Sequence, residues 1–194
     1  YQLPRGLLRE PTDGLRRADV VLITRCQAID DTALKSIQKT VTSFTESVPA
    51  LQCDHEPIAL LEYPENRLPL SRLDQQSVGV LSAIGNPDAF EHTVSQCGAV
   101  IQDARHLPDH DAYSPETVAS LRDWAQNLGP DVNCIVCTHK DLVKLQTDRL
   151  GGKQLVALQI EMRLQGESQH LIQMLESIEE EATKASTIND QTMA

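Results

Sequence analysis

Four ionisable side chains within six residues form the densest cluster of potential chemistry in this chain: His106, Asp109, His110 and Asp111. An aspartate beside a histidine can fix the tautomer of the imidazole. His110 could therefore act as a general base, or as a cation facing a phosphate, with Asp109 beside it. The same four groups could instead hold a divalent metal ion. In a third interpretation they lie in solvent, in the loop before a helix.

A second cluster, Thr138-His139-Lys140-Asp141, stands where an apolar run gives way to a helical pattern. A lysine at such a helix start can reach a phosphate or a base, which makes Lys140 and Asp141 candidate nucleotide-binding residues. Because these two residues are adjacent, the segment does not match the Asn/Thr-Lys-x-Asp pattern used for guanine. Alternatively, Thr138 caps the helix and both charged side chains lie in solvent.

The third cluster is Arg9-Glu10, near the start of the chain. The guanidinium group presents a rigid fork, so an arginine beside a glutamate can clamp a phosphate or a sugar hydroxyl. The alternative is a surface ion pair, which would contribute less than ~1 kcal/mol to stability.

The run from Val78 to Asp88 predicts a buried strand, a tight loop and a helix start. Gly85 allows the backbone to turn sharply, Asn86 can cap the helix, and Pro87 suits its first position. The free N–H groups of such a helix start can bind an anion, which makes Gly85 and Asn86 candidate nucleotide-binding residues. Alternatively, this is an ordinary connection between a strand and a helix.

Strands and helices are expected to alternate along most of the chain. The apolar patterns predict strands over residues 18–24, 78–83, 99–102, 134–138 and 155–160, and helices over 32–44, 87–96, 115–127, 139–146 and 168–181. One or two short strands are expected within 50–61, interrupted by a loop at 53–57, and a linker over 63–76.

This alternation predicts an α/β fold, with a mostly parallel or mixed sheet flanked by helices. Ligands of such folds gather at the carboxyl ends of the strands, so the loops after Ala83, Gln102 and Thr138 are expected to share one edge. We expect an irregular segment over residues 1–17, an α/β domain over 18–181 and a disordered tail over 182–194.

Composition excludes several classes of protein. The net charge of −11 argues against a nucleic-acid binder and against a polybasic membrane anchor. No run approaches the ~18 apolar residues of a membrane span, and we expect no signal peptide. Five cysteines, an odd number, suit a reducing compartment. Cys134 and Cys137 lie three apart on an expected strand, which points them to opposite faces and argues against zinc or redox chemistry.

Taken together, these segments resemble the second half of the tetraacyldisaccharide 4′-kinase family. Four motifs occur in the family's order and cover roughly residues 6–164. They are Gly6-Leu-Leu-Arg9-Glu10-Pro11 with Arg17-Ala18-Asp19, Ser82-Ala-Ile-Gly85-Asn86-Pro87 with Phe90, Pro108-Asp109-His110-Asp111-Ala-Tyr113, and Thr138-His139-Lys140-Asp141-Leu-Val-Lys144-Leu145.

The resemblance implies transfer of the γ-phosphate of ATP to the 4′-hydroxyl of a tetraacyldisaccharide 1-phosphate, a lipid A precursor, with Mg²⁺. Asp109 and His110 would stand near the phosphates, in an Asp–His arrangement whose other carboxylate comes from an N-terminal P-loop domain. Arg9 and Glu10 would line the cleft at the hinge formed by residues 1–17. The intact enzyme would work at the cytoplasmic face of the inner membrane.

The sequence departs from the family pattern in three places. Asp111 replaces a histidine, and His139 replaces a glutamate. The P-loop pattern G-x-x-x-x-G-K-[ST] is also missing from the 194 residues; Gly151-Gly152-Lys153 lacks both the earlier glycine and the following hydroxyl residue.

Because the chain opens on Tyr1, we expect the natural protein to extend upstream, and we expect these residues alone to be inactive. The alternatives are a non-catalytic α/β scaffold, or a small metal-dependent hydrolase using the loop from His106 to Asp111.

Overall fold

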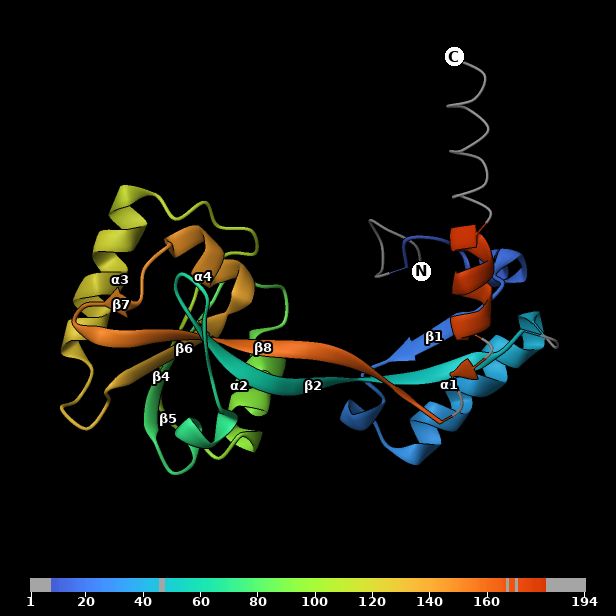
Figure 1. The fold of residues 1–194 in the computed structure, drawn as a ribbon, viewed down its shortest axis with the longest axis horizontal. Helices are drawn as coiled ribbons and strands as arrows, with labels where there is room; N and C mark the ends of the chain where they lie inside the picture. Colours follow the sequence, from blue (N-terminus) through green and yellow to red (C-terminus); the bar gives the residue numbers. More distant parts are fainter. Residues whose placement is uncertain (1–7, 46–47, 167, 170, 181–194) are drawn as a thin grey trace, which may run out of the picture. The chain divides into compact units, whose positions relative to one another are not determined.

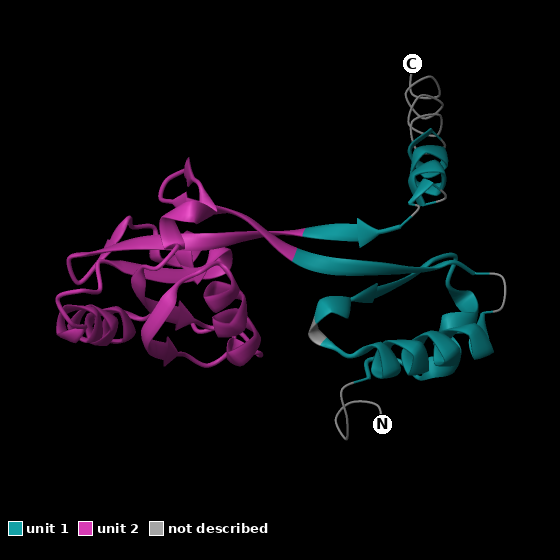
Figure 2. Cartoon of the chain, turned by 90° about the horizontal axis from the view of Figure 1, so that it is seen from below, with its two compact units in different colours: residues 1–55, 162–194 teal, residues 56–161 magenta. Residues whose placement is uncertain are grey.

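The computed structural model describes residues 8–45, 48–166, 168–169 and 171–180 (Figure 1). The chain divides into two compact units (Figure 2). The first unit comprises residues 1–55 and 162–194, and the second comprises residues 56–161. Strands β2 (Ala50–Glu62) and β8 (Lys153–Gln165) each run from one unit into the other. The expected α/β domain over residues 18–181 stays a prediction.

The sheet of the second unit is mostly parallel. Its central strand, β4, pairs in parallel with β5 on one side and β6 on the other, and β6 pairs in parallel with β8. Two short strands are antiparallel: β3 pairs with β2, and β7 with β8. Among the described strands the order is β1-β2-β8-β6-β4-β5, which confirms the expected mostly parallel or mixed sheet. The bounds are β3 Asn66–Leu68, β4 Ser77–Ser82, β5 Val100–His106, β6 Cys134–Thr138 and β7 Arg149–Leu150.

Helices cover both faces of this sheet (Figure 1). Helices α3 (Pro115–Asn127) and α4 (His139–Leu145) pack on one face through Leu121, Ala125 and Leu142. Helix α2 (Pro87–Gln96) and the 3₁₀ helix η3 (Leu70–Leu73) pack on the other.

The two cysteines of β6 lie on opposite faces, as predicted. Cys137 belongs to the core on the side of α3 and α4, whereas Cys134 packs against the core on the side of α2. Both are free thiols, and their placement on opposite faces supports neither a zinc nor a redox role for the pair.

In the first unit, β1 (Val21–Thr24) pairs in parallel with the beginning of β2. Helix α1 (Asp31–Phe44) is capped by the Asp30 carboxylate, which accepts a hydrogen bond from Ala33 N. Two 3₁₀ helices, η1 (Thr12–Arg17) and η2 (Cys26–Ala28), complete the described part together with a helix over residues 171–180.

Several elements differ from the sequence-based expectations. The loop expected at residues 53–57 is wrong, because β2 is one strand of 13 residues; the fixed φ of Pro57 is compatible with extended backbone. The expected linker over 63–76 contains β3 and η3. Strand β5 is longer than predicted, because it stays paired with β4 as far as His106.

The apolar stripe of the terminal helix is exposed. Ile172, Leu175 and Ile178 are all about half exposed, although their spacing is typical of a buried stripe. The expected tail over 182–194 lies outside the described residues.

Candidate active site

The loops that follow β4, β5 and β6 meet at one edge of the sheet, as expected for parallel neighbours. Oδ2 of Asp141 accepts a hydrogen bond from Ala83 N at 3.3 Å, which joins the start of α4, directly after β6, to the loop after β4. Gly85 lies against Asp109: a Cβ atom on Gly85 would be 3.5 Å from Asp109 Oδ2. Lys144 Nζ donates to the Asp111 carbonyl at 2.6 Å. The motifs on these three loops therefore share one site.

Asp109 and His110 lie side by side and are open to solvent. His110 Nε2 is 3.8 Å from Asp109 Oδ2, and the two side chains are 77% and 51% exposed. This separation is longer than a hydrogen bond, so the Asp109 carboxylate lies beside the imidazole without bonding to it. An exposed histidine of this kind can take up a proton or face an anion.

The backbone of this loop is strained. His110 has φ of 63° and Tyr113 has φ of 54°, in the left-handed region that residues with a Cβ atom rarely adopt. Each such residue costs of order 1 kcal/mol or more, and the conformation persists only where surrounding contacts enforce it. The 3.0 Å bond from Asp111 N to Pro108 O closes a turn around His110.

Contacts at the end of the loop help to hold the left-handed backbone of His110 and Tyr113. The Tyr113 side chain is buried, and its backbone N–H donates to Asp111 Oδ1 at 2.7 Å. The Lys144 ammonium lies 5.6 Å from the centre of the Tyr113 ring, in addition to its bond to the Asp111 carbonyl. Asp111, which departs from the family pattern, therefore shapes the loop. Sequence reasoning missed this role, although the Asx-turn pattern of an aspartate two residues before Tyr113 could have indicated it.

Asp141 is buried, so the interpretation that places it in solvent is wrong. It is only 1% exposed, and its Oδ2 accepts the Thr138 hydroxyl at 2.7 Å as well as Ala83 N. Its Oδ1 and the Tyr113 hydroxyl are buried, each without a partner within bonding distance. Burial and, secondly, the Asp141 charge raise the pKa of the Tyr113 phenol. Lys140, in contrast, is exposed and free to meet a ligand.

The start of α2 has the predicted cap. Asn86 Oδ1 accepts a hydrogen bond from Ala89 N at 3.2 Å, and Pro87 is the first helical residue. Gly85 does not adopt a positive φ, so the turn does not depend on glycine in the way that the sequence suggested. Its position opposite Asp109 is its main structural link to the site.

His106 faces away from the other ionisable groups of its loop. Its Nδ1 lies 3.0 Å from Ser82 Oγ, and its Nε2 lies 2.7 Å from Glu91 Oε1. Among the described residues, no three His, Cys, Asp or Glu side chains are grouped so that they could hold a metal ion. The described residues therefore provide no set of metal ligands for the alternative of a metal-dependent hydrolase. They provide no complete set of ligands for Mg²⁺ either.

Arg9 and Glu10 belong to the first unit and are exposed. The Glu10 carboxylate pairs with Arg17, and both side chains are largely in solvent. Glu10 therefore forms its ion pair with Arg17, and not with the neighbouring Arg9 as the alternative supposed. An exposed pair of this kind contributes little to stability.

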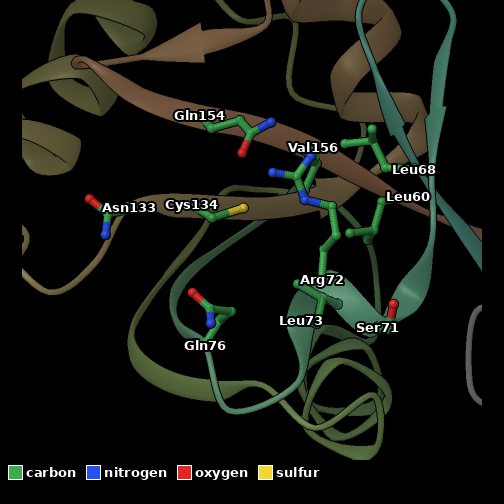
Figure 3. A pocket seen from close by; sticks show the side chains of 10 residues that line it. All are labelled: Leu60, Leu68, Ser71, Arg72, Leu73, Gln76, Asn133, Cys134, Gln154 and Val156. Atoms are coloured by element: carbon green, nitrogen blue, oxygen red, sulfur yellow. The ribbon is translucent and has the colours of Figure 1, made fainter.

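A pocket of about 360 Å³ lies at the opposite end of the strands (Figure 3). It is bordered by Gln76 and Asn133, which directly precede β4 and β6, and by Gln154, the second residue of β8. The Arg72 side chain extends from η3 across it (Figure 3). Burial raises the pKa of Cys134, in its wall, to about 12, so that thiol stays protonated at neutral pH. None of the sequence-predicted site residues lines this pocket.

None of the helices in the described part of the chain is both long and apolar enough to cross a membrane.

Comparison with known proteins gives one consistent family. A family model described as tetraacyldisaccharide-1-P 4′-kinase matches residues 1–179. A tetraacyldisaccharide 4′-kinase from Elusimicrobium minutum is 30% identical over 170 residues, which are 86% of this chain and 44% of the relative. One from Anaeromyxobacter is 30% identical over 178 residues, or 91% of this chain and 47% of the relative. The chain thus spans less than half the length of these relatives.

A solved structure has the same fold. It is the crystal structure described as the apo form of LpxK from Aquifex aeolicus in complex with ATP. The TM-score is 0.61 at 25% identity, and the match covers 91% of this chain and 48% of that one.

Proposed function

The chain belongs to the tetraacyldisaccharide-1-P 4′-kinase family, and we propose that it forms one half of a kinase acting on a lipid A precursor. The donor would be ATP, and the acceptor the 4′-hydroxyl of a tetraacyldisaccharide 1-phosphate. The observation that carries this proposal is the shared edge of the sheet. There the strained loop presents Asp109 and His110 to solvent beside Gly85 and the start of α2.

In the proposed reaction, the 4′-oxygen attacks the γ-phosphorus of ATP. The bond between this phosphorus and the β,γ-bridging oxygen breaks, so ADP leaves with that electron pair. The hydroxyl proton must be removed, and His110, with Asp109 beside it, can accept it directly or through a carboxylate of the other half. Catalysis of phosphoryl transfer is mainly positioning and charge stabilisation, so an exposed, pre-shaped Asp–His loop suits this role.

The remaining groups would come from an N-terminal P-loop domain of the same protein. The 194 residues contain no P-loop pattern, and the described residues offer no complete set of Mg²⁺ ligands. Mg²⁺, when bound, would neutralise phosphate charge. Lys140 would contact the nucleotide from this chain, and Arg9 and Glu10 would line the substrate cleft. Asp141, being buried, would support Lys140 rather than touch the nucleotide.

We also propose that the protein works at the cytoplasmic face of the inner membrane. The acceptor is a lipid, so the site must reach a membrane surface, and ATP is supplied from the cytoplasm.

Replacing His110 tests this function in the full-length natural protein. We expect His110→Ala to lower kcat by roughly 10²–10⁴-fold, because a proton acceptor in the transition state is worth about this much. The measurement is phosphate transfer from ATP to tetraacyldisaccharide 1-phosphate. His92→Ala, an exposed histidine on α2, is the matched control and should keep wild-type activity.

A wild-type rate for His110→Ala would contradict the catalytic role. It would favour the scaffold interpretation, in which these motifs serve only to build the fold.

A further inference from the structure

The histidine that precedes the reactive loop makes two side-chain contacts that the proposed chemistry does not use. His106 is the last residue of β5, and its ring lies between Ser82 Oγ and Glu91 Oε1 at 3.0 and 2.7 Å. Ser82 is the last residue of β4, and Glu91 lies on α2. The imidazole therefore joins three elements: both strands that lead into the site and the helix that begins there.

The Glu91 carboxylate places a proton on one ring nitrogen. An ionised Glu91 only accepts, so the proton lies on Nε2 and is donated to Glu91. Nδ1 can then accept the hydroxyl proton of Ser82. The residue types match a hydrolase triad, but Ser82 is completely buried and so is not accessible as a nucleophile. The arrangement serves position rather than covalent chemistry.

Backbone hydrogen bonds also join the ends of β4 and β5 next to this imidazole. Ser82 and His106 are register partners in the pairing of β4 with β5, and Leu107 N donates to Ser82 O at 2.9 Å. From this fixed point only three residues separate His106 from His110. The strained φ of His110 needs anchors on both sides. Tyr113, Asp111 and Lys144 form the anchor that follows it, and His106 forms the one that precedes it.

We propose that His106 is a positioning residue, whose bridge between Ser82 and Glu91 holds the loop so that Asp109 and His110 face the reacting phosphate. This inference rests on the proposed function. A shift of about 1 Å in a reacting group can cost roughly 10²-fold in rate, so a bridge remote from the substrate can control kcat. Because His106 touches no ligand in this scheme, its loss should affect the rate and leave ATP binding nearly intact.

The test uses His106→Ala, His106→Gln and Glu91→Ala in the full-length natural protein. We expect His106→Ala to lower kcat by roughly 10–100-fold, with KM for ATP changed by less than about threefold. Glu91→Ala should have a similar effect, and the double variant should be no slower than His106→Ala, since both remove one bridge. His106→Gln retains a donor near the place of Nε2, so it should recover most of the rate.

Controls separate positioning from general destabilisation. His92→Gln makes the same substitution at the exposed neighbour of Glu91 and should leave kcat unchanged. Each variant is assayed well below its thermal midpoint. If His106→Ala does not fold, Glu91→Ala decides, because that side chain is 31% exposed and its loss should be tolerated.

A second readout does not depend on activity. In NMR spectra of labelled histidines, the Nε2 proton of His106 should be bonded and slow to exchange, unlike that of His92. Rapid exchange, wild-type kcat in His106→Ala, or independent multiplication of the two single effects would overturn the proposal. If His110→Ala abolishes transfer while His106→Ala does not, only the positioning role fails; if His110→Ala is fully active, the proposed function fails first.

Discussion

Asp141 shows how one buried carboxylate can hold a site together without entering its chemistry. It receives the Thr138 hydroxyl from its own helix start and Ala83 N from the loop after β4. Buried acceptors of this kind are valuable because their loss leaves donors unsatisfied in a place that water does not reach. The fourth motif of the family pattern therefore has two parts: an exposed Lys140 for a ligand and a buried Asp141 for the fold.

We predict that Asp141→Ala lowers the free energy of unfolding by about 2–4 kcal/mol. The change removes a shared acceptor and leaves the Thr138 hydroxyl and Ala83 N–H without it. Urea denaturation followed by circular dichroism measures the loss. Asp123→Ala, on the exposed side of α3, is the control and should stay within about 0.5 kcal/mol of wild type. A similar small change for Asp141→Ala would mean that its buried contacts do not stabilise the fold.

At the scale of single elements, strand β6 carries one thiol on each of its two faces, and burial raises the pKa of both. Its two thiols lie on opposite sides of the sheet, and both are shielded from water. Burial raises the pKa of Cys134 to about 12 and that of Cys137 well above its ordinary value of 9.0. In the folded protein both thiols therefore stay protonated at a pH where the unfolded chain loses those protons.

The sign of the resulting pH dependence follows from this difference. Below about pH 9 both states hold the protons, and the thiols do not oppose folding; above it the unfolded state binds fewer protons, so stability falls as pH rises. We predict a loss of about 1.5 kcal/mol for each thiol between about pH 8 and pH 10. The measurement is urea unfolding at both pH values, and Cys134→Ala and Cys137→Ala should each flatten the dependence. An unchanged slope in both variants would show that other groups cause it.

Helix starts were predictable from sequence because their signals are local. Asn86, Ser114 and Thr138 each cap the helix that their own neighbours predict. Strand lengths were less predictable, because β2 and β5 continue as far as their partners in the sheet allow. These partners are distant in the sequence, and no local pattern encodes them.

The candidate site, like the fold, was predictable from the sequence only in part. The sequence indicated which residues would gather, because parallel strands bring their carboxyl ends to one edge. It could not indicate that Asp141 would be buried or that His106 would turn toward Ser82, 24 residues away. Such roles depend on packing between elements, so residue type and spacing left several interpretations open.

At the scale of the whole molecule, the two units contribute different residues to the proposed site. The motifs from Gly85 to Lys140 all lie in the second unit, whereas Arg9 and Glu10 lie in the first. Relatives are more than twice as long as the matched region, with 44% and 47% of their lengths covered. The proposed kinase therefore requires residues beyond those of this chain, and the 194 residues alone provide a direct test.

We predict that the purified 194-residue chain does not transfer phosphate from ATP to tetraacyldisaccharide 1-phosphate, whereas the full-length natural protein does. The reason is physical: γ-phosphoryl transfer depends on a cradle for the phosphates and on cations that neutralise developing charge. This sequence has no P-loop pattern, and its described residues include no group that could hold a metal ion. Mass spectrometry of the lipid product measures transfer, and a cooperative unfolding transition shows that the short chain is folded. The N-terminal sequence and intact mass of the protein isolated from its source cells define the full-length control.

Transfer by the folded short chain would contradict the proposal that ATP is bound mainly by residues outside this chain, because it would place a complete ATP site within these residues. A native protein without a P-loop would instead overturn the kinase proposal, and the Asp109–His110 loop would then need another anionic ligand to explain its strained, exposed form.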